Sequence, residues 1–373
     1  MSEIKGWCPG AWTPMRSGDG LILRVRPPMG HITRDQALGL CSAARGLANG
    51  IIDLTNRANL QLRGVRGEGY QPLLDQLLDL RLIDPDPATE KRRNIMMTPF
   101  CERGDLSWQL AEELVARLDA LPPLPAKFGF AIDCGDAPVL TGDPADIRFE
   151  RASDGGLLIR ADGADWGRLV APEEAVDAAI MLAYWFAQHQ TPEARRMRAL
   201  ADRLPDVWQQ EMPALVARRP EPGRRAEGFL LGVAFGSMTE TALRGLLDQT
   251  GAQEVILTPW RMILLPGVTE ARRPGFVTEP GSRLLAAHAC AGAPACASAT
   301  VETRALALKL AAQTEGSLHV SGCAKGCAFP RKADVTLVGR EGAFDLVRHG
   351  ASWDEPARRG LAHDELMNGR ETL

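Results

Sequence analysis

The stretch Gly20-Leu-Ile-Leu-Arg-Val25 returns far along the chain as Gly228-Phe-Leu-Leu-Gly-Val233. Its side chains alternate as they do in a β-strand. Residues 34–48 then have helical spacing, and residues 51–65 alternate again. Two dipeptides of this last segment also recur, without a gap between them: Leu54-Thr55 and Gly64-Val65 match Leu257-Thr258 and Gly267-Val268. A strand–helix–strand unit that occurs twice indicates a duplication in which each half supplies part of one shared sheet.

The rest of the chain divides around these two copies. An α/β region over 87–209 contains helical patterns at 106–118 and 172–189. Residues 203–225 are rich in proline and arginine, which is typical of a linker into the second half. A last unit begins near Gly281 and contains four of the eight cysteines. A length of 373 residues suits roughly two to four compact units.

The composition excludes several classes of protein. Hydrophobic residues make up 45% and charged residues 24%, which is the balance of a soluble globular protein. A net charge of −4 gives no global attraction to nucleic acid or to an anionic membrane, so we expect neither as a partner. The most apolar long stretch, 176–187, is interrupted by Asp177 and is too short to span a bilayer. The first residues contain no apolar run, so we expect no secretory signal and a cytoplasmic protein.

Four cysteines fall in two pairs, Cys290-x5-Cys296 and Cys323-x3-Cys327, which are separated by 26 residues. The cytosol keeps thiols reduced, so metal ligation explains these pairs better than a disulfide framework does. Structural zinc sites favour tighter pairs than the x5 spacing, and bacterial and plant ferredoxins space their cysteines differently. The pattern indicates two loops that each offer two thiolates to one metal centre. A structural zinc site and four unrelated buried thiols are the alternatives.

The residues around the two pairs suit an iron–sulfur cluster. The loop Cys290-Ala-Gly-Ala-Pro-Ala-Cys296 consists of small residues, as a loop around a bulky inorganic cube requires. Leu318-His-Val320 has the pattern of a short strand, after which the second pair is expected on one face of an opening helical turn. Gly322 and Gly326 let backbone amides approach the sulfurs. The remaining cysteines lack ligand-like spacing and are expected to be packed, inert thiols: Cys8, Cys41, Cys101 and Cys134.

The first pair together with Ser321-Gly-Cys-Ala-Lys-Gly-Cys327 resembles the cluster motif of sulfite and assimilatory nitrite reductases. Within that superfamily the chain resembles the precorrin-3B synthase family in Cys8-Pro-Gly10, Pro14-Met15 and Ser17-Gly-Asp-Gly-Leu-Ile-Leu-Arg-Val-Arg26. The resemblance covers nearly the whole chain, since duplicated ferredoxin-like halves belong to the same architecture. It implies that Cys290, Cys296, Cys323 and Cys327 hold a [4Fe–4S] cluster.

The resemblance also implies the fold. This is an α+β fold in which duplicated ferredoxin-like half domains form a shared sheet beside two α/β nitrite/sulfite reductase-like domains. The expected units are a first half domain, a first reductase-like domain, a second half domain and a C-terminal reductase-like domain with the cluster, over residues 1–75, 85–210, 225–280 and 281–373.

The first copy of the repeat is rich in arginine. From Arg16 to Glu68 there are eight arginines and four acidic residues, and this local excess of positive charge indicates an anion site. If 57–63 is a strand, alternate positions share one face, and the same holds for 20–26. The side chains expected on this cationic wall are Arg24, Arg26, Arg57, Asn59, Gln61 and Arg63.

The second copy has lost these charges. Gap-free pairing places Trp260 opposite Arg57, Met262 opposite Asn59, Leu264 opposite Gln61 and Pro266 opposite Arg63. One repeat is therefore cationic and the other apolar, which predicts a cleft with one charged and one apolar wall. Such a cleft suits a tetrapyrrole, a large flat ligand edged with carboxylates, because the planar fork of arginine pairs bidentately with carboxylate. An ordinary solvated sheet face is the alternative.

Two further positions resemble siroheme-contacting residues of the superfamily. Arg93, in Arg92-Arg-Asn-Ile95, matches an Arg-Asn motif. Lys127, in Pro125-Ala-Lys-Phe128, matches the first lysine of a Lys-x-Lys pair whose second lysine is here Gly129. This departure weakens the case for sulfite reduction, because the small anion would lose one cation, and leaves nitrite reduction open.

The resemblance to precorrin-3B synthases implies an O2-dependent monooxygenase of aerobic cobalamin biosynthesis. It would hydroxylate precorrin-3A at C20 with γ-lactone formation and NADH as formal reductant. It would use a second, mononuclear non-haem iron and no siroheme. The sequence identifies neither a catalytic residue nor ligands for that iron, and His288 and His319 are expected to be packed or surface histidines.

Electrons should reach the cluster from outside the chain. No dinucleotide-binding or Walker motif follows a predicted strand, so we expect an external reductase or ferredoxin-like donor. Two alternative functions remain open. One is a siroheme-dependent nitrite or sulfite reductase, and the other is a non-catalytic iron–sulfur electron carrier.

Overall fold

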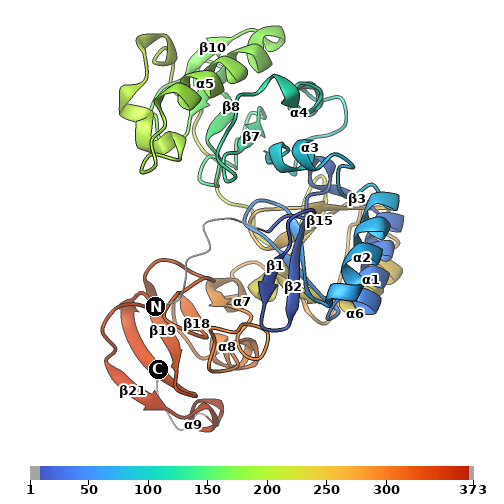
Figure 1. Ribbon diagram of the computed structural model, residues 1–373, viewed down its shortest axis with the longest axis vertical. Coiled ribbons are helices and arrows are strands. Elements are labelled where there is room, and N and C mark those ends of the chain that lie inside the picture. The colour runs from blue at the N-terminus through green and yellow to red at the C-terminus, as the bar shows by residue number, and fades with distance from the viewer. Residues whose placement is uncertain (1–8, 369–373) are drawn as a thin grey trace.

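The computed structural model describes residues 9–368, which form an α+β fold with four sheets. Figure 1 shows three blocks along the long axis of the molecule. The two half domains lie in the centre, the middle domain at one end and the C-terminal domain at the other. The fold class expected from the sequence is confirmed.

The first half domain contributes most of a five-stranded sheet. Its strands follow the order β1 (Met15–Ser17), β2 (Gly20–Val25), β5 (Leu60–Val65), β4 (Ile51–Leu54) and β13 (Ser237–Thr239). Helices α1 (Arg34–Leu47) and α2 (Gly67–Asp79) lie on one side of it (Figure 1). Helix α1 begins after a capping box, in which Thr33 and Gln36 satisfy each other's backbone amides.

The second half domain repeats this design. Its sheet has the order β11 (Gly223–Arg224), β12 (Gly228–Val233), β15 (Met262–Pro266), β14 (Glu254–Leu257) and β3 (His31–Thr33), with β16 (Phe276–Val277) beside β12. Helix α6 (Glu240–Thr250) begins after Thr239, whose hydroxyl accepts from the amide of Ala242. Left-handed backbone recurs at matching turns, in Met29 and Phe235 and again in Ala58 and Arg261. The duplication therefore extends to backbone conformation.

The two halves exchange edge strands. Strand β3 of the first half pairs with β14 of the second, and β13 of the second pairs with β4 of the first. The shared sheet expected from the sequence therefore takes the form of two sheets, each completed by the other half. One hydrophobic core contains residues of both halves, with α1 packed against α6, so the pair folds as one body.

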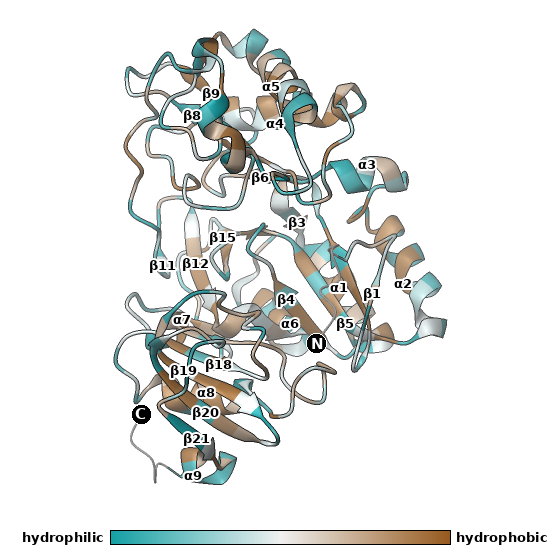
Figure 2. Ribbon diagram, turned by 60° about the vertical axis from the view of Figure 1, so that its left-hand side comes forward, coloured by the Kyte–Doolittle hydropathy of each residue, from teal (hydrophilic) through white to brown (hydrophobic). Residues whose placement is uncertain are grey.

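The two remaining sheets belong to the flanking domains. The middle sheet has the order β10 (Arg168–Val170), β9 (Leu157–Ala161), β8 (Ile147–Arg151), β7 (Phe130–Asp133) and β6 (Ile95–Met97), with α3 (Pro87–Arg92), α4 (Leu106–Ala116) and α5 (Ala175–His189). The C-terminal sheet has the order β17 (Ala287–Ala289), β18 (Leu318–Ser321), β19 (Ala333–Arg340), β20 (Ala343–Gly350) and β21 (Arg358–Leu361), with α7 (Arg283–Ala286), α8 (Arg304–Ala311) and α9 (His363–Met367). Figure 2 shows apolar strands inside both the half domains and the C-terminal sheet. Within the described part of the chain, every helix is too short or too polar to cross a bilayer.

Two local expectations are wrong. Strand β5 begins only at Leu60, because Ala58 has a left-handed φ of 52° that turns the chain before the strand. Arg57 and Asn59 therefore lie in a turn and do not alternate with Gln61 along a strand. The segment after β18 forms a series of turns instead of an opening helical turn, since Gly326 also has a left-handed φ of 62°.

Candidate active site

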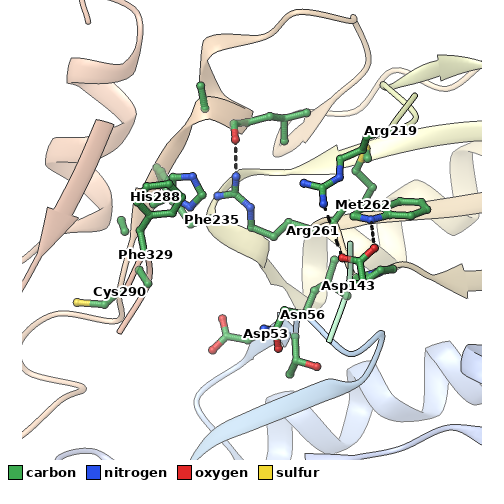
Figure 3. A pocket seen from close by; sticks show the side chains of 18 of the residues that line it. Asp53, Asn56, Asp143, Arg219, Phe235, Arg261, Met262, His288, Cys290 and Phe329 are labelled. Carbon is green, nitrogen blue, oxygen red and sulfur yellow. Dashed lines mark hydrogen bonds and ion pairs between the residues drawn. The ribbon is translucent and has the colours of Figure 1, made fainter. Parts of the chain in front are cut away.

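A cavity of about 1050 Å³ lies where the domains meet. Both half domains, the middle domain, the linker and the C-terminal domain contribute to its wall, and Figure 3 shows side chains from these parts converging on it. The charged residues that line it are six arginines and three acids: Arg63, Arg218, Arg219, Arg261, Arg304, Arg331, Asp53, Asp143 and Glu221. The cavity is therefore net cationic in a chain whose total charge is −4.

The cysteine motif borders this cavity. Cys290 directly follows β17, and Cys323 comes two residues after the end of the adjacent parallel strand β18. Parallel neighbours end at the same edge of a sheet, which brings the two loops together. The amide of Gly322 donates to Cys290 Sγ at 3.2 Å, as the glycine beside Cys323 led us to expect. Cys290 and Cys327 line the cavity, whereas Cys296 and Cys323 do not.

The first cysteine loop is held against the first half domain. The Ser17 hydroxyl donates to the Ala295 carbonyl at 2.8 Å, and the Arg63 guanidinium donates to the same oxygen at 3.2 Å. A Cβ at Gly18 would lie 2.8 Å from the carbonyl oxygen of Pro294, so only glycine fits this contact. The Ser17-Gly18 segment, which carries part of the family resemblance, therefore packs on the cysteine loop.

The four thiols share one electrostatic environment. Burial raises the pKa of Cys327, and the neighbouring Cys323, Cys290 and Cys296 raise it further. Thiols that repel one another's ionised forms in this way need a cation or a cationic cluster to coexist as thiolates. The donor set, the glycine contacts and the Gly322 amide all fit an iron–sulfur cluster, with Cys290, Cys296, Cys323 and Cys327 as the residues that would hold it.

Metal-ligating side chains are not closely gathered in the part of the chain that the structure describes. Among residues 9–368, no three or more His, Cys, Asp or Glu side chains converge closely enough to bind a single metal ion. This holds for the four cysteines as well, so the preference for a cluster over a structural zinc ion rests on the spacing of the cysteines in the sequence.

Three of the other cysteines behave as packed thiols. Burial raises the pKa of Cys41 to about 11 and the pKa values of Cys101 and Cys134 to about 12. Thiols with such values hold little of the reactive thiolate at neutral pH. Cys8 lies outside the described residues.

The structure brings together part of the predicted cleft. Gln61 and Arg63 of the first repeat line the cavity, and so do Trp260 and Met262 of the second. Arg24 pairs in register with Gln61 across β2 and β5, so it lies on the same sheet face but outside the cavity lining. Gln61, Arg63, Trp260 and Met262 are therefore the residues of the two predicted walls that line this cavity, and a cleft with one charged and one apolar wall stays a prediction.

Arg26 and Arg93 lie elsewhere, around a buried carboxylate. Arg93 contacts Glu90 Oε2 at 2.6 Å, Arg26 donates to the Glu90 carbonyl at 2.6 Å, and Arg93 donates to the Arg26 carbonyl at 2.8 Å. Burial raises the pKa of Glu90, although the charges of Arg93 and Arg26 counteract it. These arginines stabilise a buried contact and do not face the cavity.

Arg57, Asn59 and Lys127 are also outside the cavity lining. Arg57 donates to the Lys127 carbonyl at 2.9 Å, while Lys127 is exposed and Asn59 is buried in the turn before β5. A Cβ on Gly129 would lie 2.8 Å from an Arg57 nitrogen and 2.5 Å from the side-chain nitrogen of Asn94. The space that a second lysine would need is therefore filled.

Sequence reasoning missed several cavity arginines. Arg261 lies in the turn between β14 and β15, and gap-free pairing would have placed it opposite Ala58 as a charge gained by the second repeat. Arg218 and Arg219 belong to the segment interpreted only as a linker. Arg304 pairs with Asp53 at 3.0 Å, and Arg331 stacks over Phe329 with its guanidinium carbon 4.6 Å from the ring centroid.

The two histidines beside the cysteines lie in register on neighbouring strands. His288 lines the cavity with its ring centroid 4.0 Å from that of Phe329, whereas His319 is fully buried. Burial lowers the pKa of His288 to about 3, with smaller contributions from the charge of Arg261 and from His319. It lowers the pKa of His319 to about 4. His319 is thus packed as expected, while His288 faces the cavity.

Comparisons with known proteins find relatives of this chain in sequence and in fold. Residues 13–80 match the nitrite/sulfite reductase ferredoxin-like half domain. The chain is 30% identical to a precorrin-3B synthase from a Sinorhizobium species, over 94% of this chain and 84% of that protein. It is 24% identical to a ferredoxin–nitrite reductase of Synechococcus elongatus, over 96% of this chain and 86% of that protein. The Mycobacterium tuberculosis NirA structure shares the fold, with a TM-score of 0.61 and 16% identity over 93% of this chain and 79% of that one.

Proposed function

The chain belongs to the precorrin-3B synthase family of the sulfite/nitrite reductase-like superfamily, and we propose that it converts precorrin-3A to precorrin-3B in the cavity between its domains. It is an oxidoreductase of the monooxygenase type in cobalamin biosynthesis. In the reaction, one oxygen atom of O2 becomes a hydroxyl at C20 of the substrate, and an acetate side chain closes the γ-lactone. The other oxygen atom becomes water with two electrons and two protons, for which NADH is the formal source.

The observation that carries this proposal is the composition of the cavity wall. Two of the four cluster cysteines, Cys290 and Cys327, border the same space as Trp260 and Arg63. A tetrapyrrole bound there would lie against aromatic surface and meet arginines at its carboxylate rim. The cavity volume of about 1050 Å³ lies at the upper end of ordinary ligand sites, as a large flat substrate requires.

The cluster, when bound, supplies single electrons at the edge of this cavity. The protein's own part is to bind and orient the substrate and to hold the cysteine loops. Arg63 does both, because it lines the cavity and also donates to Ala295 in the first cysteine loop. Cys296 and Cys323 lie away from the cavity, so we infer that electrons from an external reductase or ferredoxin-like donor enter on their side. We expect this exchange to take place in the cytoplasm.

The described residues do not fit the second iron. A mononuclear non-haem iron needs several His or carboxylate ligands around one point, and no such group of three is present among residues 9–368. We therefore assign no step to it. O2 and the substrate are the two reactants that the cavity has to accommodate.

A siroheme-dependent nitrite or sulfite reductase is the second candidate. Its support is the 24% identity to a nitrite reductase over almost the whole chain. Against it, Lys127 is exposed outside the cavity lining and the position of Gly129 has no room for a lysine. The small anion would lack both members of the lysine pair.

Anaerobic purification with measurement of the absorption spectrum, iron and sulfide tests the two candidates. We expect iron and acid-labile sulfide in the ratio of a [4Fe–4S] cluster, a broad visible shoulder and no Soret band. With a reductase, NADH and O2, the protein should convert precorrin-3A to a product heavier by one oxygen atom. A stoichiometric haem-type chromophore together with nitrite reduction would establish the second candidate instead.

A further inference from the structure

Arg261 presents an unneutralised charge to the cavity. It comes from the turn between β14 and β15 and lies between His288 and Arg219 (Figure 3). Its guanidinium donates to the main-chain oxygens of Leu285 and Ala287, the latter at 2.7 Å. No carboxylate of the described chain forms an ion pair with it, although a desolvated charge is costly unless an opposite charge compensates it.

Arg219 approaches the same place from the linker. Its guanidinium lies 3.7 Å from Asp143 Oδ1, which is a loose ion pair, and its side chain is 60% exposed. Asp143 also accepts the indole N–H of Trp260 at 2.8 Å, so part of its acceptor capacity is used. Burial and the positive charge of Arg219 lower the pKa of Arg261 to about 10. The positive charge of Arg219 therefore disfavours the charged form of Arg261, and among the described residues Asp143 forms an ion pair with Arg219 but not with Arg261.

We propose that Arg219 and Arg261 form an anion subsite that binds one carboxylate of the tetrapyrrole substrate. This inference rests on the proposed function and assigns the carboxylate contact to the second half and the linker instead of to the arginine-rich first repeat. A carboxylate between the two guanidinium groups neutralises both, and each planar fork can donate two hydrogen bonds to it.

The position of the pair fits the rim of a flat ligand. Trp260 and Met262 line the cavity on either side of Arg261 in the sequence, and the Trp260 indole is tied to the same Asp143 that Arg219 contacts. A ring that lies on this apolar wall places its acidic side chains at the arginines. Arg261 is also fixed by two carbonyls, so it is oriented before the ligand arrives and loses little freedom on binding.

The same charges would also attract a small inorganic anion, and the experiment separates these sources. Binding of uroporphyrin, a porphyrin whose rim carries acetate and propionate groups, is measured by fluorescence quenching on the intact protein. The variants are Arg219→Gln and Arg261→Gln, with Arg203→Gln as the matched control on an exposed linker arginine outside the cavity. Nitrite and sulfite are then added as competitors.

We expect uroporphyrin affinity to fall about tenfold or more in each cavity variant and to stay unchanged in Arg203→Gln, with no displacement by nitrite or sulfite. Because both arginines would contact one group, the losses should be less than additive in the double variant. Arg261→Gln removes the hydrogen bonds from Arg261 to the Leu285 and Ala287 carbonyls and can therefore disturb the local fold. Arg219 is exposed, so Arg219→Gln tests the subsite without this disturbance.

Three results overturn the subsite. The first is that Arg219→Gln and Arg261→Gln both bind uroporphyrin with wild-type affinity. The second is that Arg203→Gln loses as much affinity as the two cavity variants. The third is that nitrite or sulfite displaces uroporphyrin from the wild-type protein and that this displacement is lost in both cavity variants. A failure of the proposed function looks different. In that case the wild-type protein itself does not bind uroporphyrin, and no substitution changes the result.

Discussion

The amide N–H of Gly322 donates to Cys290 Sγ across 3.2 Å and so joins the loop after β18 to the cysteine after β17. The approach is close because both loops consist of small residues there. A Cβ added at Gly322 would lie 2.6 Å from the Cβ of Ala299 and 3.4 Å from the Cα of Gly292. Hydrogen bonds from backbone amides stabilise the electron-rich sulfurs of a cluster and help to set its potential. The glycine is therefore part of the proposed cluster site without being a ligand.

Gly322→Ala should loosen the cluster without removing a ligand. The added methyl group has to push the Ala299 loop away, which lengthens or breaks the hydrogen bond to Cys290. We expect normal iron content after anaerobic purification, a shifted reduction potential and faster iron loss in air. Gly46→Ala is the control, because nothing lies within 4 Å of its added Cβ. An unchanged potential and iron half-life in Gly322→Ala would contradict this role.

Cys296→Ser or Cys323→Ser should abolish the cluster signal. Each removes one of the four thiolates proposed to hold the cluster, and a four-thiolate site has no spare ligand. Iron, acid-labile sulfide and the EPR spectrum of the reduced protein measure the effect. Cys101→Ala should keep all three signals, because that thiol is a packed one with a pKa of about 12. A serine variant with full iron, sulfide and an unchanged spectrum would falsify the assignment.

Arg63 and Arg57 should differ in their effect on substrate binding. Arg63 lines the cavity and donates to Ser17 Oγ at 3.0 Å and to Ala295, so Arg63→Ala should weaken uroporphyrin binding about tenfold and speed iron loss. Arg57 donates to the Lys127 carbonyl instead, so Arg57→Ala should change neither quantity. Arg45→Ala, on the exposed face of α1, is the matched control. Equal losses in Arg57→Ala and Arg63→Ala would mean that both arginines act on the ligand.

The sequence was sufficient for the duplication and for the grouping of the cysteines. Alternation and helical spacing depend on local geometry, so β2, α1 and the matching elements of the second copy appear where the pattern predicts them. The sequence also places Cys290 and Cys323 shortly after two short strands. In the structure these strands are parallel neighbours that end at the same edge of one sheet, so the two cysteines lie on neighbouring loops. These features can be predicted without knowing which residues far apart in the sequence come into contact.

The remaining features depend on tertiary contacts that no local pattern contains. An alternating run cannot reveal that Ala58 adopts a left-handed conformation, which removes Arg57 and Asn59 from the strand. Nor can it reveal that Glu90 binds Arg93 in the interior. Arg219 reaches the cavity only because the linker returns along its wall. The strongest sequence signal for an anion site therefore marked a half domain that borders the cavity, but few of the charged side chains that line it.

His319 should make stability depend on acidic pH. It is fully buried on β18, and neither of its ring nitrogens has a hydrogen-bond partner within the described chain. Burial lowers its pKa to about 4, whereas an unfolded histidine titrates near 6.5. Between these values the unfolded state binds more protons than the folded state, so the free energy of unfolding decreases as pH falls through this window. The full loss is about 3 kcal/mol, since one pKa unit corresponds to about 1.4 kcal/mol.

His319→Leu should remove this part of the pH dependence, because leucine fills a similar buried volume and binds no proton. Urea unfolding of both proteins at several pH values between 7.5 and 4 measures the slope. At pH 7.5 the buried imidazole is neutral, so any difference there reports packing alone. His189→Gln, at an exposed histidine on α5, is the control for the loss of a histidine outside the C-terminal sheet. If wild type and His319→Leu lose the same stability between pH 6.5 and 4, the imidazole of His319 is charged or solvated in the folded protein, and the packing of β18 against β17 differs from that described here.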